Sequence, residues 1–120
     1  LDHLTDHPAG GLSGGQQKLL ALAACFIVDP TLVLLDEPFA GVHPSVKEVI
    51  SRHIASGRER GRTFILVSHD IPALAGLARR LVALSAGRVI AAGPLDAVLN
   101  APAVIDSYLG GHDSPHASFH

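Results

Sequence analysis

The segment between residues 32 and 67 most strongly limits how this chain can fold. Residues 32–35 (LVLL) form an uninterrupted apolar run, and Thr63–Val67 is a second run rich in β-branched residues. Between them, Pro44 opens a stretch whose apolar residues recur at helical spacing until Gly57 and a charged RERGR segment, where we expect the helix to end. Continuous apolar runs are typical of strands buried on both faces of a parallel sheet. The pattern predicts a strand, a helix and a strand, and therefore an α/β fold.

Polar residues follow both predicted strands. Asp36 and Glu37 come directly after the first strand, and Ser68 and His69 come directly after the second. Because parallel neighbours place their carboxyl ends at one sheet edge, where open α/β sheets bind ligands, we expect these side chains to lie close together. An aspartate there can hold Mg²⁺, and a glutamate can deprotonate an attacking water. The alternatives are a solvated strand end for the carboxylates and a satisfied core or edge histidine for His69.

A pair of glycines stands at the start of the first predicted helix. The spacing S-x-x-Q from Ser13 to Gln16 forms a capping box, so it predicts a helix that begins here and stops at the Asp-Pro pair further on. Gly14 and Gly15 leave free N–H groups at the positive end of the helix dipole accessible to an anion. A phosphate site is therefore one interpretation, and a turn or a close packing contact is the other.

The remaining sequence predicts smaller elements. We expect a short helix over residues 71–79 and a hairpin over residues 81–93 with its turn at Ala86-Gly87. Two short helices, each opened by a proline, follow over residues 94–100 and 102–109. The interpretation is one partial domain over residues 1–110, followed by a disordered tail over residues 111–120.

Composition excludes several classes of protein. The formal net charge of -2 gives no electrostatic case for nucleic-acid binding. The longest apolar run has ten residues (19–28), whereas a membrane-spanning helix needs about 20. The single cysteine, Cys25, cannot form an internal disulfide, and its apolar surroundings predict a buried thiol. The absence of methionine is what we expect of a processed or truncated C-terminal piece.

Three motifs in this order resemble one known family. LSGGQQ at residues 12–17, LVLLDEP at residues 32–38 and ILVSHD at residues 65–70 are similar to the C-terminal half of the ATP-binding subunit of ABC transporters. The resemblance extends from Leu12 to about Gly110. It implies the C-terminal part of a P-loop NTPase fold, with parallel strands, flanking helices and a terminal β-hairpin.

The resemblance also implies roles for single residues. Asp36 matches the Walker B aspartate that supports Mg²⁺, Glu37 matches the catalytic base for the hydrolytic water, and His69 matches the switch histidine that contacts the γ-phosphate. The signature motif, which contacts the γ-phosphate of ATP held by the partner subunit, is matched by Ser13, Gly14, Gly15 and Gln16.

One loop departs from the family pattern. Residues 40–44 (AGVHP) occupy the D-loop, which faces the opposite subunit across the dimer, and His43 stands where Asp or Asn is usual. A change in the dimer contacts and a tolerated exposed histidine are both open interpretations.

The phosphate cradle is missing from these 120 residues. No G-x-x-x-x-G-K-[ST] sequence occurs, because neither Lys18 nor Lys47 follows a glycine. The family's Q-loop would lie before Leu1. We therefore expect the chain alone to lack ATP hydrolysis and, with its upstream strands absent, to expose a sheet edge or an apolar face and to fold poorly.

The first hypothesis is a fragment of an ABC transporter ATPase. The resemblance implies ATP and Mg²⁺ as cofactors, a second ATP-binding subunit and transmembrane permease subunits as partners, and a peripheral location at the cytoplasmic face of the inner membrane. The segments LLDEPFAGVHP and PAVIDSYLGG resemble branched-chain amino-acid importers, while PFAG also occurs in lipopolysaccharide-export ATPases. The second hypothesis is a degenerate, non-hydrolysing module that lends its signature motif to a partner.

Overall fold

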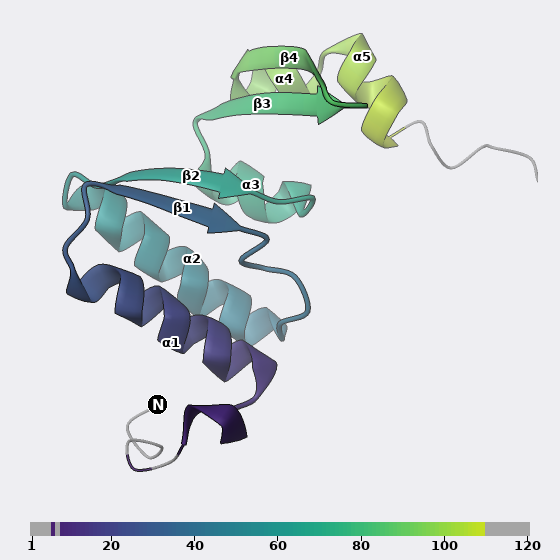
Figure 1. The fold of residues 1–120 in the computed structure, drawn as a ribbon. Coiled ribbons are helices and arrows are strands. Elements are labelled where there is room, and N and C mark those ends of the chain that lie inside the picture. Colours follow the sequence, from purple (N-terminus) through teal and green to yellow (C-terminus); the bar gives the residue numbers. More distant parts are fainter. Residues whose placement is uncertain (1–5, 7, 110–120) are drawn as a thin grey trace, which may run out of the picture. The chain divides into compact units, whose positions relative to one another are not determined.

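The structure, a computed structural model, describes residue 6 and residues 8–109 (Figure 1). The chain divides into two compact units, Leu1–Leu77 and Ala78–His120, and each is considered by itself. The tail predicted over residues 111–120 lies outside the described residues.

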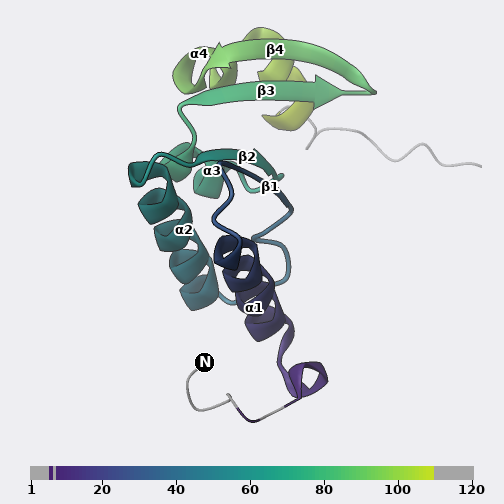
Figure 2. The same ribbon diagram turned by 60° about the vertical axis from the view of Figure 1, so that its left-hand side comes forward.

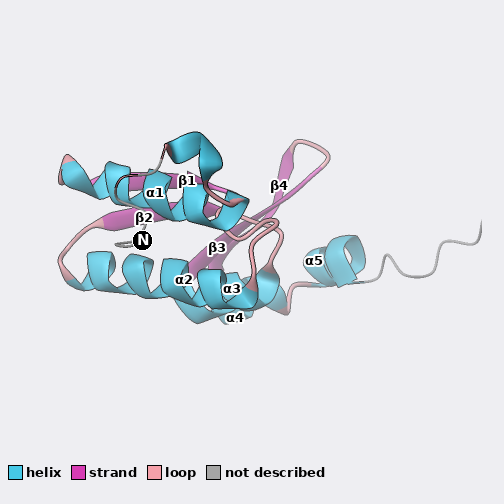
Figure 3. Cartoon of the chain, turned by 90° about the horizontal axis from the view of Figure 1, so that it is seen from below, coloured by secondary structure: helices cyan, strands magenta, loops and turns pink. Residues whose placement is uncertain are grey.

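The first unit is built on the predicted strand, helix and strand. Strands β1 and β2 pair in parallel, with Leu32 opposite Thr63 and Asp36 opposite Val67. Helices α1 and α2 run alongside one another on one face of the two strands (Figures 1 and 2). Figure 3 shows the same elements from below. The predicted α/β unit is therefore confirmed, and its elements are a 3₁₀ turn at Ala9–Gly11, α1 at Gly14–Ile27, β1 at Leu32–Asp36, α2 at Pro44–Glu59, β2 at Thr63–Val67 and α3 at Ile71–Leu77.

Helix α1 begins where the capping box predicts. The Gln16 backbone N–H donates to Oγ of Ser13 at 3.3 Å, and the Ser13 N–H donates to Oε1 of Gln16 at 2.9 Å. At the other end the chain turns through Asp29, whose φ of 49° is left-handed. The Arg62 guanidinium pairs with the Asp29 carboxylate and so ties this turn to the segment before β2.

The core of the first unit lies between the strands and the helices. Phe39, which follows β1 in a loop, is only 1% exposed. It packs with three buried aliphatic side chains: Leu22 of α1, and Ile50 and Ile54 of α2. The loop after β1 is therefore anchored in the core.

The opposite face of the two strands is exposed, so the prediction of strands buried on both faces is wrong for this unit. Leu34 is 69% exposed, and Leu32, Ile65 and Val67 are also exposed. The reason is the two-residue period of a strand, since the helices cover only the face that carries Val33 and Leu35. The expectation of an exposed apolar face is confirmed.

Cys25 is also exposed, which corrects the prediction of a buried thiol. The packed stripe of α1 runs through Leu19, Leu22 and Phe26. Cys25 lies beside this stripe and lines a small cavity of about 160 Å³. An apolar run alone does not reveal which side of a helix is covered.

Gly57 lies inside α2 rather than at its end, so that part of the predicted helix end is wrong, whereas the RERGR segment at residues 58–62 does contain the end. The helix passes through Gly57 and ends at Glu59. A Cβ atom at position 57 would lie 2.7 Å from Cζ of Phe64 in β2. The glycine therefore serves a close approach between helix and strand.

We expect Gly57→Ala to destabilise the protein by about 1–3 kcal/mol, because the added methyl must displace a packed ring. The matched control is Gly76→Ala, at an exposed site in α3 where nothing lies within 4 Å of the added atom. That change should stabilise by about 0.5–1 kcal/mol, because alanine loses less backbone entropy in a helix. The urea unfolding midpoints of the two variants measure both changes in stability. A shift of the same sign in the two variants contradicts the close approach of Gly57 to Phe64.

The second unit is a hairpin with short helices. Strands β3 (Arg80–Ser85) and β4 (Arg88–Pro94) pair antiparallel. Ala86 and Gly87, with φ of 48° and 74°, form the predicted turn. The Tyr108 hydroxyl donates to the Leu84 carbonyl, and the helical elements are α4 at Leu95–Leu99, α5 at Pro102–Val104 and a π-helical turn at Ile105–Leu109. Among the described residues, no helix is long and apolar enough to cross a bilayer.

Candidate functional site

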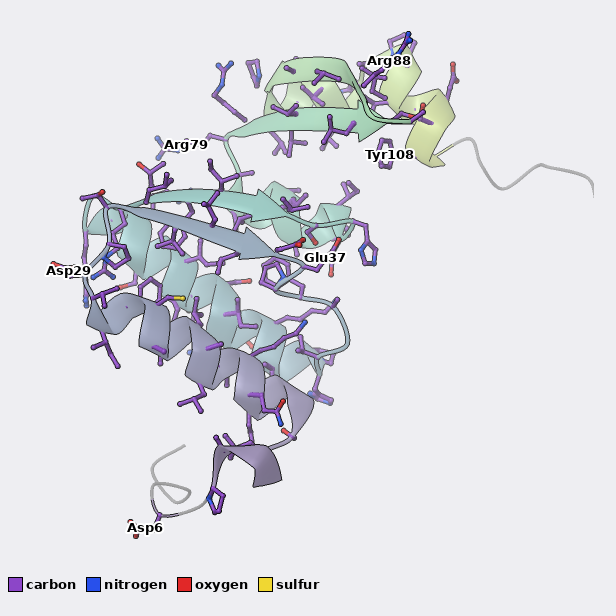
Figure 4. All side chains as sticks on the ribbon, viewed as in Figure 1. Asp6, Asp29, Glu37, Arg79, Arg88 and Tyr108 are labelled. Atoms are coloured by element: carbon purple, nitrogen blue, oxygen red, sulfur yellow. The ribbon has the colours of Figure 1, made fainter. Side chains whose placement is uncertain are left out.

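Glu37 and His69 meet at the carboxyl edge of the two strands, as the sequence predicts. Nδ1 of His69 lies 3.0 Å from Oε1 of Glu37. Figure 4 shows Glu37 just past the end of β1, at the opposite end of the strands from Asp29. An ionised carboxylate only accepts hydrogen bonds, so Nδ1 carries the proton of this contact. Nε2 is then the ring atom left for another ligand.

The backbone of Glu37 has an unusual conformation. Its φ is 47°, in the left-handed region that residues other than glycine rarely adopt. The Glu37 N–H donates to the Val67 carbonyl at 2.7 Å, which fixes the residue to the end of β2. This conformation turns the chain away from the direction of β1 at Glu37, the residue whose carboxylate contacts His69.

The second carboxylate oxygen of Glu37 fits a ligand-binding role. Oε2 is buried and has no hydrogen-bond partner among the described residues. A buried carboxylate oxygen without a partner is costly, and a water or a metal-bound group would satisfy it.

In the described part of the chain, the Asp36 side chain takes no part in the contact between Glu37 and His69. It ends β1 on the exposed face and faces Val67 in the strand register. No group of three or more His, Cys, Asp or Glu residues that could hold a metal occurs in the described part of the chain. Mg²⁺ is usually bound by one or two carboxylates together with substrate phosphates and waters, so the side chains present fit such an ion only alongside a nucleotide.

The two glycines of LSGGQQ have different surroundings. A Cβ at Gly14 would meet no atom of the described residues within 4 Å, whereas a Cβ at Gly15 would lie 3.3 Å from a methyl of Val46 in α2. Gly15 therefore serves close helix packing, and Gly14 leaves the amino end of α1 open. The packing interpretation therefore holds for Gly15, whereas a phosphate site at the amino end of α1 stays a prediction. No hydrogen bond or ion pair links Ser13 or Gln16 to Asp36, Glu37 or His69 in the described part of the chain.

Lys18 is a residue of this site that sequence reasoning missed. Its Nζ donates to the Glu37 carbonyl at 3.0 Å and also to the Ala40 carbonyl. In the sequence, Lys18 is distinguished only as the one charged residue of α1. A single cation in a helix of otherwise uncharged residues was the one sign in the sequence that Lys18 has a specific contact.

His43 caps helix α2. Its Nδ1 accepts from the Ser45 backbone N–H at 3.3 Å and lies 2.9 Å from the Ser45 hydroxyl. Asp and Asn are common residues at such helix starts because their side chains accept from the first free N–H groups. The imidazole thus does here what a carboxylate or amide does at other helix starts.

The loop that carries His69 is held by Asp70. Oδ2 of Asp70 lies 2.6 Å from Nζ of Lys47 in α2, and Oδ1 accepts from the Ala73 N–H at 3.1 Å at the start of α3. The Asp70 N–H donates to the Ser68 hydroxyl at 3.1 Å. Hydrogen bonds from Lys47 and then from the Ala73 N–H hold the pKa of the Asp70 carboxyl below its ordinary value of 3.8.

This shift predicts an acid-sensitive contribution to stability. Because the folded-state pKa of Asp70 is depressed, its contribution is present above pH 3.8 and is lost as the pH falls through the lower, folded-state value. Lys47→Gln removes the largest cause, so we expect the pKa of Asp70 to rise toward 3.8 and acid unfolding to begin at higher pH. NMR titration of the Asp70 side-chain carboxyl carbon measures this. Arg52→Gln, elsewhere on α2, is the control, and an unchanged Asp70 titration in Lys47→Gln contradicts the prediction.

Comparison with protein families gives a match over most of the first unit. The family described as "AAA domain, putative AbiEii toxin, Type IV TA system" matches residues 2–76, more than half of the chain. The match includes both strands of the first unit and the three motifs of the sequence analysis.

Curated relatives are ATP-binding proteins of transport systems. A probable branched-chain amino acid transport ATP-binding protein of Archaeoglobus fulgidus is 37% identical, over 95% of this chain and 44% of the relative. A nickel import ATP-binding protein of Rhodobacter capsulatus is 41% identical, over 88% and 42%. A lipopolysaccharide export system ATP-binding protein of Haemophilus influenzae is 33% identical, over 92% and 46%. The chain spans less than half the length of these relatives.

Solved structures give the same result for the fold. A nucleotide-free ATP-binding cassette from an ABC transporter superposes with a TM-score of 0.81 at 32% identity, covering 90% of this chain and 44% of that one. A dimeric ATP-binding cassette in a post-hydrolysis state, bound to ADP and Pi, superposes with a TM-score of 0.71 at 28% identity, covering 79% and 41%. The predicted P-loop NTPase fold is confirmed.

Proposed function

The chain belongs to the AAA-domain family and has the fold of ABC transporter ATP-binding cassettes, and from this premise we propose that it is part of an ATP-hydrolysing transporter subunit. The observation that carries the proposal is the contact of Glu37 with His69 at the sheet edge, where the other carboxylate oxygen has no partner within residue 6 and residues 8–109. That arrangement suits a base that must take a proton from a water. The 120 residues lack a phosphate loop, so the proposed activity belongs to the longer protein that supplies one.

In the proposed hydrolysis of ATP, Glu37, His69 and Asp36 each have a separate role. Glu37 accepts the proton of the attacking water through Oε2 while His69 holds Oε1. With Nδ1 committed to Glu37, His69 presents Nε2 to the transferring phosphoryl group, where a proton on Nε2 would stabilise negative charge. Asp36 is the residue that would hold Mg²⁺, which neutralises phosphate charge when bound.

We further propose a branched-chain amino-acid importer as the parent system. The similarity to the Archaeoglobus fulgidus relative supports this assignment, together with the segments LLDEPFAGVHP and PAVIDSYLGG. The alternative is a lipopolysaccharide-export ATPase, which the PFAG segment and the Haemophilus influenzae relative favour. The nickel import relative has a higher sequence identity than the Archaeoglobus fulgidus relative, so overall sequence identity does not identify the transported solute.

The proposed subunit works as a dimer. The open amino end of α1 at Gly14 supports the use of Ser13, Gly14, Gly15 and Gln16 on ATP held by a second ATP-binding subunit. A similar cassette is dimeric in a solved structure. In this proposal the dimer binds transmembrane permease subunits and so lies peripherally at the cytoplasmic face of the inner membrane.

The experiment that tests the proposal starts from the coding region. Reading upstream of Leu1 in frame should reveal a G-x-x-x-x-G-K-[ST] segment, and the encoded protein should hydrolyse ATP in the presence of Mg²⁺. If no such segment is present, the fragment hypothesis is lost. The second hypothesis, a non-hydrolysing module that lends its signature motif, then predicts binding of a fluorescent ATP analogue only after the chain is mixed with a P-loop-bearing partner.

A further inference from the structure

Lys18 connects the two parts of the proposed site, which are the signature segment at residues 13–16 and the proposed base Glu37. It lies in α1 one turn beyond the signature glycines, and its side chain is partly buried. Nζ donates to the carbonyl of Glu37 at 3.0 Å and to that of Ala40. The same side chain lines the small cavity that Asp36 and Glu37 also line. A single ammonium group thus joins helix α1 to the loop that follows β1.

The carbonyls that Lys18 contacts belong to a tight turn. The Ala40 N–H donates to the Glu37 carbonyl at 3.2 Å, so Lys18 reinforces an oxygen that already closes the turn. Glu37 itself has a positive φ, which surrounding contacts must maintain. Its N–H is held by Val67 of β2, and its carbonyl is held by Lys18 of α1. The backbone on both sides of the Glu37 carboxylate is therefore fixed from different elements.

A second contact joins α1 to the segment beyond this turn. Gly15 packs against Val46 so closely that an added Cβ would lie 3.3 Å from a Val46 methyl. Val46 lies in the first turn of α2, directly after the loop that His43 ends. Helix α1 therefore contacts the loop at its start, through Lys18, and just beyond its end, through Gly15.

We propose that Lys18 is a positioning residue that couples the signature segment to the catalytic base, by holding the backbone of Glu37 and Ala40 from helix α1. The coupling part rests on the proposed function, in which Ser13 to Gln16 act on a partner's nucleotide and Glu37 acts on the subunit's own. A shift of α1 when the signature segment engages ATP moves the ammonium group, and with it the turn that orients Glu37. Lys18 makes no contact with a reacting atom in this account.

The test compares Lys18→Met, which keeps the length of the side chain but removes the donor, with Lys18→Arg, which keeps a cationic donor. Both are made in the full-length protein that carries this chain. We expect Lys18→Met to lower kcat for ATP hydrolysis about 10- to 100-fold with KM changed less than about threefold, because the base is displaced while phosphate contacts remain. Lys18→Arg should restore most of kcat. Arg52→Met, on an exposed part of α2, removes a charge elsewhere and is the control.

Hydrogen exchange provides a readout that does not depend on catalysis. In nucleotide-free protein, the Ala40 amide should exchange about 10-fold faster or more in Lys18→Met than in wild type, while the amides of β1 keep their rates. Equal Ala40 protection in wild type and Lys18→Met overturns the proposal, as does a kcat that Lys18→Arg fails to restore. If the wild-type protein does not hydrolyse ATP, the proposed function and the coupling are lost together. The exchange rates then decide separately whether Lys18 holds the loop.

Discussion

Replacing Glu37 by Gln should reduce ATP turnover by the full-length protein about 10²- to 10⁴-fold, the usual contribution of a general base. Glutamine has nearly the same shape and keeps an oxygen that can accept from Nδ1 of His69, so the contact at the sheet edge survives. It cannot take a proton from water, so the chemical step alone is lost. The affinity for ATP should change less than about threefold, because Glu37 acts on the water and makes no phosphate contact in this account.

The measurement is a pair of numbers for each variant, kcat for ATP hydrolysis and Kd for ATP. Glu48→Gln, an exposed carboxylate on α2, is the matched control and should leave both unchanged. If Glu37→Gln weakens ATP binding by the same factor as it slows turnover, Glu37 is not the base and its assigned role is refuted.

Phe39→Ala should destabilise the protein by about 3–5 kcal/mol, which is a large part of the 5–15 kcal/mol typical of a domain. The ring is 1% exposed and packs with Leu22, Ile50 and Ile54, so its removal leaves a cavity among residues from two helices. Because Phe39 lies in the turn that follows Glu37, the cavity forms directly beneath the candidate site. Catalysis should therefore decline together with stability.

Urea unfolding monitored by circular dichroism measures this loss. Phe39→Leu keeps most of the apolar volume and should cost clearly less than the alanine variant. Leu34→Ala removes a side chain that is 69% exposed and should change stability by about 0.5 kcal/mol or less. If Phe39→Ala and Leu34→Ala have similar effects, Phe39 is not the anchor that its burial indicates.

Features set by local sequence were predicted well. The capping box placed the start of α1 at Ser13, because both hydrogen bonds span only three residues. The hairpin turn at Ala86 and Gly87 follows from two adjacent positions with positive φ. The meeting of Glu37 with His69 joins separate elements but was also predicted, because parallel strands share a common carboxyl edge whatever packs on their faces.

Features that depend on packing between elements were not predicted. The sequence predicts a helix end at Gly57 because glycine often ends helices. The true reason for the glycine, its approach to the Phe64 ring, comes from a separate strand and is not visible in the local sequence. Cys25 and Leu34 are exposed because only one face of their elements is covered, and the apolar runs around them do not show which face. Lys18 reaches carbonyls 19 and 22 residues away, a contact that no sequence spacing indicates.

The capping role of His43 lies between these two cases. A proline directly after it predicted the helix start correctly, since Pro is favoured in the first turn. The side chain was open to interpretation because histidine is not among the favoured capping residues, although Nδ1 has the acceptor that the position needs. Several residue types can accept the hydrogen bond that caps a helix. His43 therefore departs from the family pattern of Asp or Asn without losing the cap.

Titration of the purified 120-residue chain with a fluorescent ATP analogue and Mg²⁺ tests whether Asp36, Glu37 and His69 act on a nucleotide whose phosphates are held by residues outside this chain. We expect no saturable tight binding by the chain alone. We expect tight, Mg²⁺-dependent binding and hydrolysis by a protein that carries a phosphate loop in frame before Leu1. Tight binding by the isolated monomeric chain would show that these 120 residues hold the phosphates themselves, contrary to this expectation.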